Sequence, residues 1–268
     1  MIPAFCKKDI ELFKKYLLQS SNYFEFGSGG STYQAYKSKN IKQIYSVESS
    51  NKWIYQILDN LKTRDFQVNT NSYTANRLYF FDIEFNTKMG HLGLPLGAKG
   101  EKTNFLISSK NTKINSININ EDNELTGFIK KIQTASPYNH LIEYRNENDE
   151  LVELWVHPKL IKLTNQDIIN KFNQYSDSIL KLHKNVNISL DLVLIDGRFR
   201  VMCALKTFNL IDDNCIVLID DFRNRKSYHV LLDFYQIVEY GERMVALKKK
   251  NNTIIPQHIF QKYENDVR

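Results

Sequence analysis

A glycine-rich stretch near the start of the chain, EFGSGGST at residues 25–32, has the composition of a ligand-binding turn. It follows an apolar run that begins at Tyr23 and precedes a stretch typical of the start of a helix. Gly27, Gly29 and Gly30 lack side chains, so the backbone can bend sharply there and approach a ligand closely. A helix that begins after this turn would point free backbone N–H groups at that ligand.

A carboxylate stands where such a unit needs a second ligand contact. The apolar run at residues 44–47 reads as the next strand and ends on Glu48, about 20 residues past the glycines. An acidic residue at this distance binds the ribose hydroxyls in nucleotide-binding strand–helix–strand units. A glycine-rich turn alone is weak evidence, but the turn together with Glu25 and Glu48 predicts a nucleotide-type cofactor.

Carboxylates follow most of the predicted strands, including the two described above. Six of them follow apolar runs: Glu25, Glu48, Asp82, Asp196, Asp220 and Asp221. The carboxyl ends of parallel strands meet at one edge of a sheet, where doubly wound folds bind their ligands. One acidic strand end is often a turn former, but six at one edge favour a functional site.

These segments resemble class I S-adenosylmethionine (SAM)-dependent methyltransferases. The strings EFGSGGST at 25–32 and SVES at 46–49 resemble motif I and the acidic position that follows it. The strings IDGRFRV at 195–201 and IDDF at 219–222 resemble one subgroup, some members of which are encoded in surface-polysaccharide gene clusters. The resemblance covers about residues 21–100 and 190–248. In the loop at 90–95, the tryptophan of the subgroup is absent.

The resemblance implies SAM as the cofactor and assigns residues to it. Four would surround its methionine portion: Glu25, Gly27, Ser28 and Gly29. Glu48 would bind the ribose hydroxyls, and Asp82 would lie near the adenine. Asp196 would face the transferred methyl group and the acceptor.

Two mechanisms are open at this point. In the first, Asp196 or a nearby histidine, His91 or His229, acts as general base on an acceptor hydroxyl. In the second, Asp196, Asp220 and Asp221 hold Mg²⁺, which prefers oxygen ligands. Their placement is similar to the carboxylate set of catechol-type O-methyltransferases, and the metal would lower the pKa of the acceptor hydroxyl.

Basic and aromatic residues follow two of the acidic strand ends. They are Arg198, Arg200, Arg225 and Tyr228. One interpretation is salt bridges between the arginines and the acidic cluster. The other is an anionic acceptor, since arginine binds phosphate or carboxylate with two parallel hydrogen bonds. A phosphorylated sugar, a nucleotide-linked sugar or a phosphoramidate would fit.

The bulk composition sets limits on the class of protein. The chain has 268 residues, of which 42% are hydrophobic and 25% charged, so we expect a globular protein with a sizeable core. Its three scattered cysteines form no disulfide framework or zinc pattern, which favours a reducing cytoplasm. No apolar run approaches the about 20 residues of a membrane span. The net charge of +6 comes largely from scattered Lys/Asn-rich stretches.

Strands and helices must alternate to place these residues together. Helices are predicted at residues 9–19, 31–38, 50–61, 201–210 and 228–237. Asp9 can cap the first helix and Ser49 or Ser50 the third, in which Trp53 belongs to the periodic apolar residues. A polar link is predicted between the third helix and the strand at 77–84. Strands are predicted at 23–26, 44–48, 77–84, 190–196 and 215–219, with a terminal antiparallel pair at 238–240 and 244–247. This order predicts an α/β, Rossmann-like, doubly wound and mostly parallel sheet with helices on both faces.

Residues 101–188 interrupt this alternation. A β-hairpin is predicted at 141–145 and 150–156, followed by a helix at 167–182. We interpret the segment as an α+β insertion within one domain of residues 1–268. It could be a lid, a wall of the acceptor pocket or a contact between two copies in a homodimer.

The leading hypothesis is a cytoplasmic SAM-dependent methyltransferase, most simply an O-methyltransferase acting on a small or saccharide-type acceptor in surface-polysaccharide or capsule synthesis. A nucleic-acid methyltransferase is less favoured, because no concentrated basic stripe with interleaved aromatics is evident. A methyltransferase fold used as a non-catalytic binding subunit is a further alternative. An NAD-binding dehydrogenase is the weakest, since the glycine spacing is not Gly-x-Gly-x-x-Gly.

Overall fold

The computed structural model describes residues 1–62, 67–69, 72–83, 173–186, 188–264 and 266, together with five short strands between residues 107 and 156. The chain divides into two compact units. The first consists of Met1–Glu84 and Asn173–Glu264, and the second contains Phe85–Phe172. The predicted helix at 167–182 falls partly outside the described residues.

The first unit is built on one mixed sheet. In the described part of the chain it has nine strands, in the order β13-β14-β12-β11-β1-β2-β5-β4-β3. The strands are β1 (Asn22–Phe26), β2 (Gln43–Glu48), β3 (Gln67–Asn69), β4 (Ser72–Ala75), β5 (Leu78–Asp82), β11 (Leu192–Ile195), β12 (Ile216–Ile219), β13 (Tyr235–Tyr240) and β14 (Val245–Lys249). The central five, β5-β2-β1-β11-β12, pair in parallel, whereas both ends of the sheet are antiparallel. The predicted fold class and the terminal antiparallel pair are confirmed.

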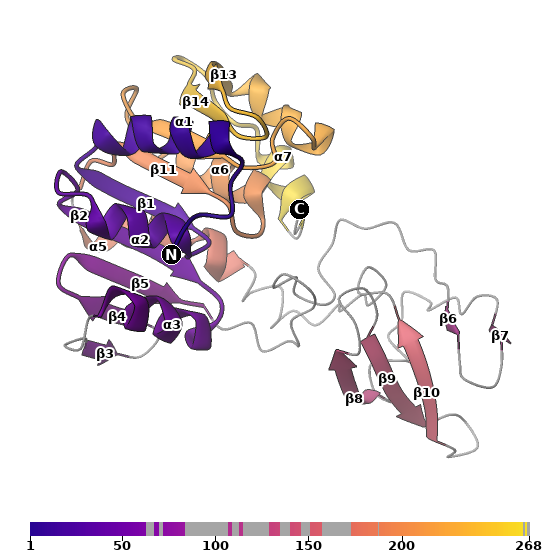
Figure 1. Ribbon diagram of the computed structural model, residues 1–268. Helices are drawn as coiled ribbons and strands as arrows, with labels where there is room; N and C mark the ends of the chain where they lie inside the picture. The colour runs from indigo at the N-terminus through magenta and orange to yellow at the C-terminus, as the bar shows by residue number, and fades with distance from the viewer. Residues whose placement is uncertain are drawn as a thin grey trace. The chain divides into compact units, whose positions relative to one another are not determined.

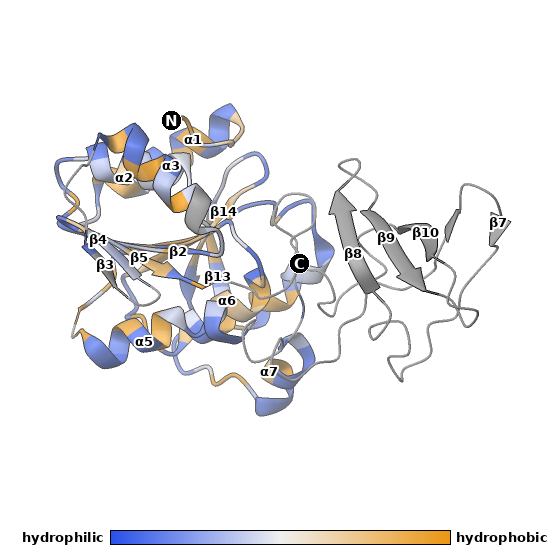
Figure 2. Cartoon of the chain, turned by 90° about the horizontal axis from the view of Figure 1, so that it is seen from below, coloured by the Kyte–Doolittle hydropathy of each residue, from blue (hydrophilic) through white to orange (hydrophobic). Residues whose placement is uncertain are grey.

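Helices cover both faces of this sheet (Figures 1 and 2). One face carries α1 (Lys7–Leu18), α2 (Gly30–Lys37) and α3 (Asn51–Leu61). The other carries α5 (Ser178–Asn185) and α6 (Arg200–Phe208), and the short helix α7 (Gln257–Tyr263) packs against α6. Figure 2 shows that each of these helices contains orange, apolar residues, and those of α1 and α6 include buried ones such as Phe13 and Leu205.

The central strands are apolar on both faces because both faces are covered. Every residue of β11 and β12 is buried, and Phe24, Val193 and Leu218 have no exposed surface. Continuous apolar runs are typical of parallel strands that lie between two helical layers. This packing makes the strands a rigid base for the polar residues that follow them.

The predicted helix at 228–237 is wrong in its second half. A 3₁₀ helix, η3, spans Lys226–Asp233, and Tyr235 then begins strand β13, which pairs with β14. The side chains of Tyr235, Ile237 and Glu239 are less exposed than those between them, so this segment follows the period of two that a strand requires.

Asp9 does not cap the first helix, contrary to the prediction. Helix α1 begins two residues earlier, at Lys7. The carboxylate of Asp9 is fully buried and accepts hydrogen bonds from the backbone N–H groups of Glu242, Arg243 and Met244. Asp9 therefore fastens α1 to the turn between β13 and β14.

A hairpin of β3 and β4 occupies the segment that was predicted as a polar link, and α7 was not predicted. In contrast, the predicted cap of the third helix is confirmed, because Ser50 Oγ accepts a hydrogen bond of 3.3 Å from Trp53 N. Among the described residues, no helix is both long and apolar enough to cross a membrane.

The second unit contains an antiparallel sheet of its own. Five strands are described there: β6 (Ile107–Ser108), β7 (Lys113–Ile114), β8 (Ile129–Thr134), β9 (His140–Arg145) and β10 (Leu151–Val156). Their order is β7-β6-β10-β9-β8. The hairpin predicted for residues 141–156 corresponds to β9 and β10, which pair along six residues.

Candidate cofactor and acceptor site

The predicted site residues meet at one edge of the parallel sheet. Strands β2, β1, β11 and β12 are neighbours in that order, and the last residues of β1, β11 and β12 are in register with one another and with Val47 of β2. The positions directly after them are Gly27, Asp196 and Asp220, while Glu48 lies opposite Asp82 in the β2–β5 pair. This edge also includes the point where the strand order reverses, between β1 and β11, which is the usual ligand crevice of the fold.

The turn after β1 approaches the turn after β11 very closely. Gly27 has a φ angle of +94°, and a Cβ built there would lie 2.7 Å from the Cα of Gly197. The backbone N–H groups of Asp196 and Gly197 both donate to the carbonyl of Phe26, at 3.0 and 2.7 Å. Position 27 therefore requires glycine for two reasons: its backbone is left-handed, and the close turn leaves no room for a side chain.

Gly197 is equally constrained, because the hydroxyl of Tyr175 lies where its Cβ would be. The distance from that hypothetical Cβ to the Tyr175 oxygen is 2.0 Å. We expect Gly197→Ala to lower the free energy of unfolding by about 1–3 kcal/mol through overpacking. Chemical denaturation followed by circular dichroism measures the loss. Adding Tyr175→Phe should recover part of it, and an unchanged midpoint in Gly197→Ala would contradict this packing.

Glu48 links the end of β2 to the glycine-rich turn. Its Oε2 accepts from Ser28 N at 3.2 Å, and its Oε1 accepts from Ser49 N and Ser50 N at 2.8 and 3.0 Å. Burial raises the pKa of Glu48 to about 7, against the lowering effect of these N–H groups. The carboxylate is thus held rigidly, and it changes charge near neutral pH.

Glu25 lies beneath the turn rather than at its surface. Its carboxylate has no exposed surface and accepts four hydroxyl hydrogen bonds, from Tyr23, Ser31, Thr32 and Ser46. A carboxylate has about four acceptor positions, and these are all filled within the chain. This placement favours support of the turn over direct contact with a cofactor. Thr32 links Glu25 to the turn, since its hydroxyl donates to Glu25 and accepts from Gly29 N at 2.8 Å.

The turn itself leaves room for a ligand. Apart from Gly29 itself and its two chain neighbours, no atom of the described residues lies within 4 Å of the position that a Cβ of Gly29 would take. Ser28 contributes a hydroxyl that lies 2.7 Å from that of Ser46. Asp82 lies close to Tyr73, whose hydroxyl pKa is raised by burial, by hydrogen bonding to Tyr55 and by the charge of Asp82.

Arg200 bridges the turns after β11 and β12. It is the first residue of α6, and its side chain is only 9% exposed. Its Nε donates to Gly197 O, and its two terminal nitrogens donate to the backbone carbonyls of Asp196 and Asp220 at 3.0 and 2.7 Å. The same nitrogens also contact the carboxylates of Asp196 and Asp221 at 3.3 and 3.1 Å. All five guanidinium donors are thus used within the chain, as the salt-bridge interpretation proposed.

Other arginines complete the neutralisation of the aspartates. Arg243, from the β13–β14 turn, lies 3.3 Å from Asp221 Oδ1 and 3.8 Å from Asp220 Oδ2. Arg225 lies 3.3 Å from Asp221 Oδ2. Burial raises the pKa of Asp220, with the charge of Asp221 adding to it.

The carboxyl group of Asp196 has a raised pKa. Burial raises its pKa to about 8, with the neighbouring Asp220 adding to the rise and Arg200 opposing it. Asp220 Oδ1 is buried, and it accepts no hydrogen bond from the described residues when both carboxyl groups are ionised. The two carboxyl groups lie within hydrogen-bonding reach of one another, so a proton on Asp196 would be donated to the carboxylate of Asp220.

These aspartates do not fit a Mg²⁺ site. The described residues contain no group of three or more carboxylate, histidine or cysteine side chains arranged to hold a metal ion. Asp196, Asp220 and Asp221 instead face guanidinium groups, which supply the positive charge that a cation would bring.

Of the two histidines predicted as candidate general bases, only His229 lies among the described residues. His229 stacks on Phe222 with 5.0 Å between ring centroids, and its Nε2 lies 3.2 Å from the Phe222 carbonyl oxygen. Among the described residues, no hydrogen bond or ion pair joins His229 to a strand-end carboxylate. His91, and the whole loop at 90–95, lie outside the described residues.

The remaining acceptor candidates lie together beside Arg200. Arg225 is stacked over the ring of Tyr228, 5.7 Å from its centroid. Burial lowers the pKa of Arg198, and the charges of Arg200 and Arg225 lower it further. Tyr228 itself is buried.

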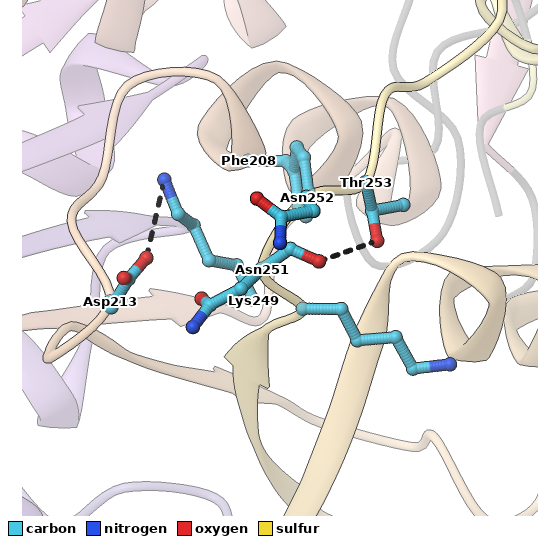
Figure 3. A pocket seen from close by; sticks show the side chains of 7 residues that line it. Phe208, Asp213, Lys249, Asn251, Asn252 and Thr253 are labelled. Atoms are coloured by element: carbon cyan, nitrogen blue, oxygen red, sulfur yellow. Dashed lines mark hydrogen bonds and ion pairs between the residues drawn. The ribbon is translucent and has the colours of Figure 1, made fainter.

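A separate pocket lies away from this edge (Figure 3). It has a volume of about 370 Å³ and is lined by Phe208, Asp213 and the turn at residues 249–253. It follows the end of β14, which runs antiparallel to β12, so it belongs to the opposite edge of the sheet. Lys249 Nζ lies 3.7 Å from Asp213 there. None of the predicted site residues lines it.

Three residues of the site were missed by sequence reasoning. Tyr175 and Arg243 come from segments far from the strand ends, and no local signal marks them. Trp53 was predicted to belong to the periodic apolar face of its helix, yet it is 38% exposed and its indole N–H donates to Ser28 O at 2.9 Å. Because Trp53 follows Glu48 by only five residues, the sequence could have indicated that it lies near the site.

Comparison with known proteins supports the fold. The chain is similar to a methyltransferase-like protein from Silicibacter pomeroyi DSS-3, with a TM-score of 0.60 and 17% sequence identity over 98% of this chain and 96% of that one. Neither a family model nor a curated protein matches the sequence. The chain thus has a methyltransferase-like Rossmann fold.

Proposed function

We propose that this chain is a SAM-dependent methyltransferase that methylates an oxygen of a small or saccharide-type, anionic acceptor. The observation that carries the proposal is the contact between Glu48 and the glycine-rich turn, through Ser28 N at 3.2 Å. A carboxylate beside such a turn, at the crevice of a doubly wound sheet, suits a cofactor that contains a ribose. The methyltransferase-like fold adds support.

The residues present fit SAM. Glu48 accepts three backbone N–H groups and, at 3.5 Å, the Ser49 hydroxyl. Of its about four acceptor positions, the one that the Ser49 hydroxyl holds at this long distance is the one that a ribose hydroxyl would take. The open space beside Gly29 admits a ligand to the backbone of the turn. Gly27 and Ser28 would hold the methionine portion and Asp82 the adenine end of the cofactor, with Glu25 acting from beneath the turn.

Asp196 is the proposed general base. Bound SAM supplies an electrophilic methyl group. Asp196 takes the proton of the acceptor hydroxyl, and a pKa of about 8 makes its carboxylate basic enough for that task near neutral pH. Arg200 fixes the turn that carries Asp196, because it holds both the carbonyl and the carboxylate of that residue. The other contribution of the chain is alignment of the acceptor oxygen.

The crowding of arginines supports an anionic acceptor. Arg198 lies near the charges of Arg200 and Arg225, which repel it. A phosphate or carboxylate group would relieve that repulsion and accept two parallel hydrogen bonds from a guanidinium. Phosphorylated sugars, nucleotide-linked sugars and phosphoramidates all carry such a group, which agrees with a role in surface-polysaccharide synthesis in the cytoplasm. The insertion at 101–188 is a candidate acceptor wall, lid or dimer contact.

Formation of S-adenosylhomocysteine tests the proposal. The protein is incubated with SAM and a panel of phosphorylated and nucleotide-linked sugars, and the product is measured by mass spectrometry. We expect acceptor-dependent product together with an acceptor that gains one methyl group on oxygen. A protein that binds the cofactor but forms no product with any acceptor would instead be a non-catalytic binding subunit.

A further inference from the structure

The exposed indole ring of Trp53 is fixed against the glycine-rich turn. Its backbone N–H is held by the Ser50 side chain at 3.3 Å, and its ring N–H is held by the Ser28 carbonyl at 2.9 Å. Ser28 N and Ser50 N both donate to the carboxylate of Glu48. Ser28 and Ser50 each form hydrogen bonds with both Trp53 and Glu48. These bonds leave the indole ring little rotational freedom.

This ring leaves apolar surface open at a polar site. Trp53 is 38% exposed even though its N–H group already has a partner. Since the ring N–H is already bonded, what the ring can still offer a ligand is its carbon atoms and π face, which gain from an apolar or aromatic neighbour. Tyr55, two residues further along α3, is also exposed, but its ring packs edge-to-face on Tyr73 at 5.5 Å and so serves a different contact.

We propose that Trp53 forms a wall of the cofactor site and covers the adenosine portion of the ligand by aromatic contact. This inference rests on the proposed function, because it assigns the ribose to Glu48. A nucleoside presents a hydroxyl pair and a planar base on one small framework, which matches a carboxylate beside a fixed aromatic ring. Base–aromatic stacking contributes without requiring hydrogen bonds to the base edges. The fixed ring also loses little side-chain entropy on binding.

The two tryptophans of the chain allow a direct test. Trp53 is in the candidate site, and Trp155 lies in β10 of the second unit. Trp155→Phe leaves Trp53 as the sole source of tryptophan emission and serves as the matched control. S-adenosylhomocysteine is titrated into wild type, Trp155→Phe, Trp53→Phe and Trp53→Ala, with affinity read by calorimetry and emission read by fluorescence.

We expect Trp155→Phe to keep the wild-type affinity and to show an emission change that saturates with the calorimetric midpoint. Trp53→Ala should weaken binding by about five- to a hundredfold, the range of base–aromatic stacking. Trp53→Phe keeps an aromatic face but loses the bond to Ser28, so it should recover most of that loss. Adenosine, titrated as a second probe, should lose affinity by a factor similar to that for S-adenosylhomocysteine.

Three outcomes overturn the inference. If the wild-type protein binds S-adenosylhomocysteine while Trp53→Ala binds it equally well and Trp53 emission is unchanged, Trp53 is not in the site and the proposed function stands. If only S-adenosylhomocysteine loses affinity and adenosine does not, Trp53 acts through the turn alone. If wild type binds neither probe in calorimetry, the proposed function fails and the inference fails with it.

Discussion

Replacing Arg200 by methionine is expected to lower the free energy of unfolding by about 3–5 kcal/mol. The substitution removes every bond that Arg200 makes across the turns after β11 and β12. It also leaves the buried carboxyl group of Asp220 with Arg243 as its remaining cationic neighbour in the described part of the chain. Urea unfolding followed by circular dichroism measures the loss.

Arg225→Met is the matched control for this experiment. Arg225 pairs with the same carboxylate, that of Asp221, at a similar distance of 3.3 Å, but its side chain is 42% exposed. An exposed pair contributes about 0–1 kcal/mol, so this variant should unfold almost as wild type does. Equal and small losses in the two variants would show that Arg200 is not the bridge described above.

Asp196→Asn is expected to reduce the rate of methyl transfer by about 10²–10⁴, the usual contribution of a general base. The amide keeps the size of the carboxyl group and can still donate to Asp220. We therefore expect a folded protein that binds S-adenosylhomocysteine with unchanged affinity. The rate is measured as S-adenosylhomocysteine formed per minute with the acceptor that the panel identifies. Activity within a factor of two of wild type would exclude Asp196 as the base.

The pH dependence of the wild type follows from the same residue. The base must be ionised, and burial raises the pKa of Asp196 to about 8, so the rate should rise with pH and level off above that value. The free energy of unfolding should change in the opposite direction, and fall as the pH rises. The folded chain holds a proton that an unfolded aspartate releases above about pH 4, so the contribution of protonated Asp196 is complete below pH 4 and is lost as the pH rises through 8. Asp196→Asn has no such proton to lose, and it should be the more stable protein above pH 8.

The fold could be predicted because its signals are local. Continuous apolar runs identified the central strands, and the glycines at 27 and 29 marked the turn. The cap of the third helix could be predicted as Ser49 or Ser50, because capping depends on residues only a few positions apart. The second half of the helix predicted at 228–237 failed for the opposite reason, since only pairing with β14 makes Tyr235–Tyr240 a strand.

The site could be predicted only as a set of strand ends. The sequence places Glu48 and Asp196 at one edge, but it does not reveal which side chains face inward. Glu25 looks equivalent to Glu48 in the sequence, yet four hydroxyls from the chain surround it. Tyr175 and Arg243 reach the site from distant segments, so their contribution depends on tertiary packing that no short motif encodes.

Calorimetric titration of S-adenosylhomocysteine tests the central claim most directly, because it needs no acceptor. We expect micromolar binding to the wild type and a loss of about 1–3 kcal/mol in Glu48→Ala, the value of a charged hydrogen bond. Glu239→Ala is the control, since that carboxylate lies on β13, at the far side of the sheet, and bonds to Lys15 and Tyr16. Its affinity should equal that of wild type. No binding by the wild type, or equal binding by wild type and Glu48→Ala, would contradict a SAM site at the glycine-rich turn.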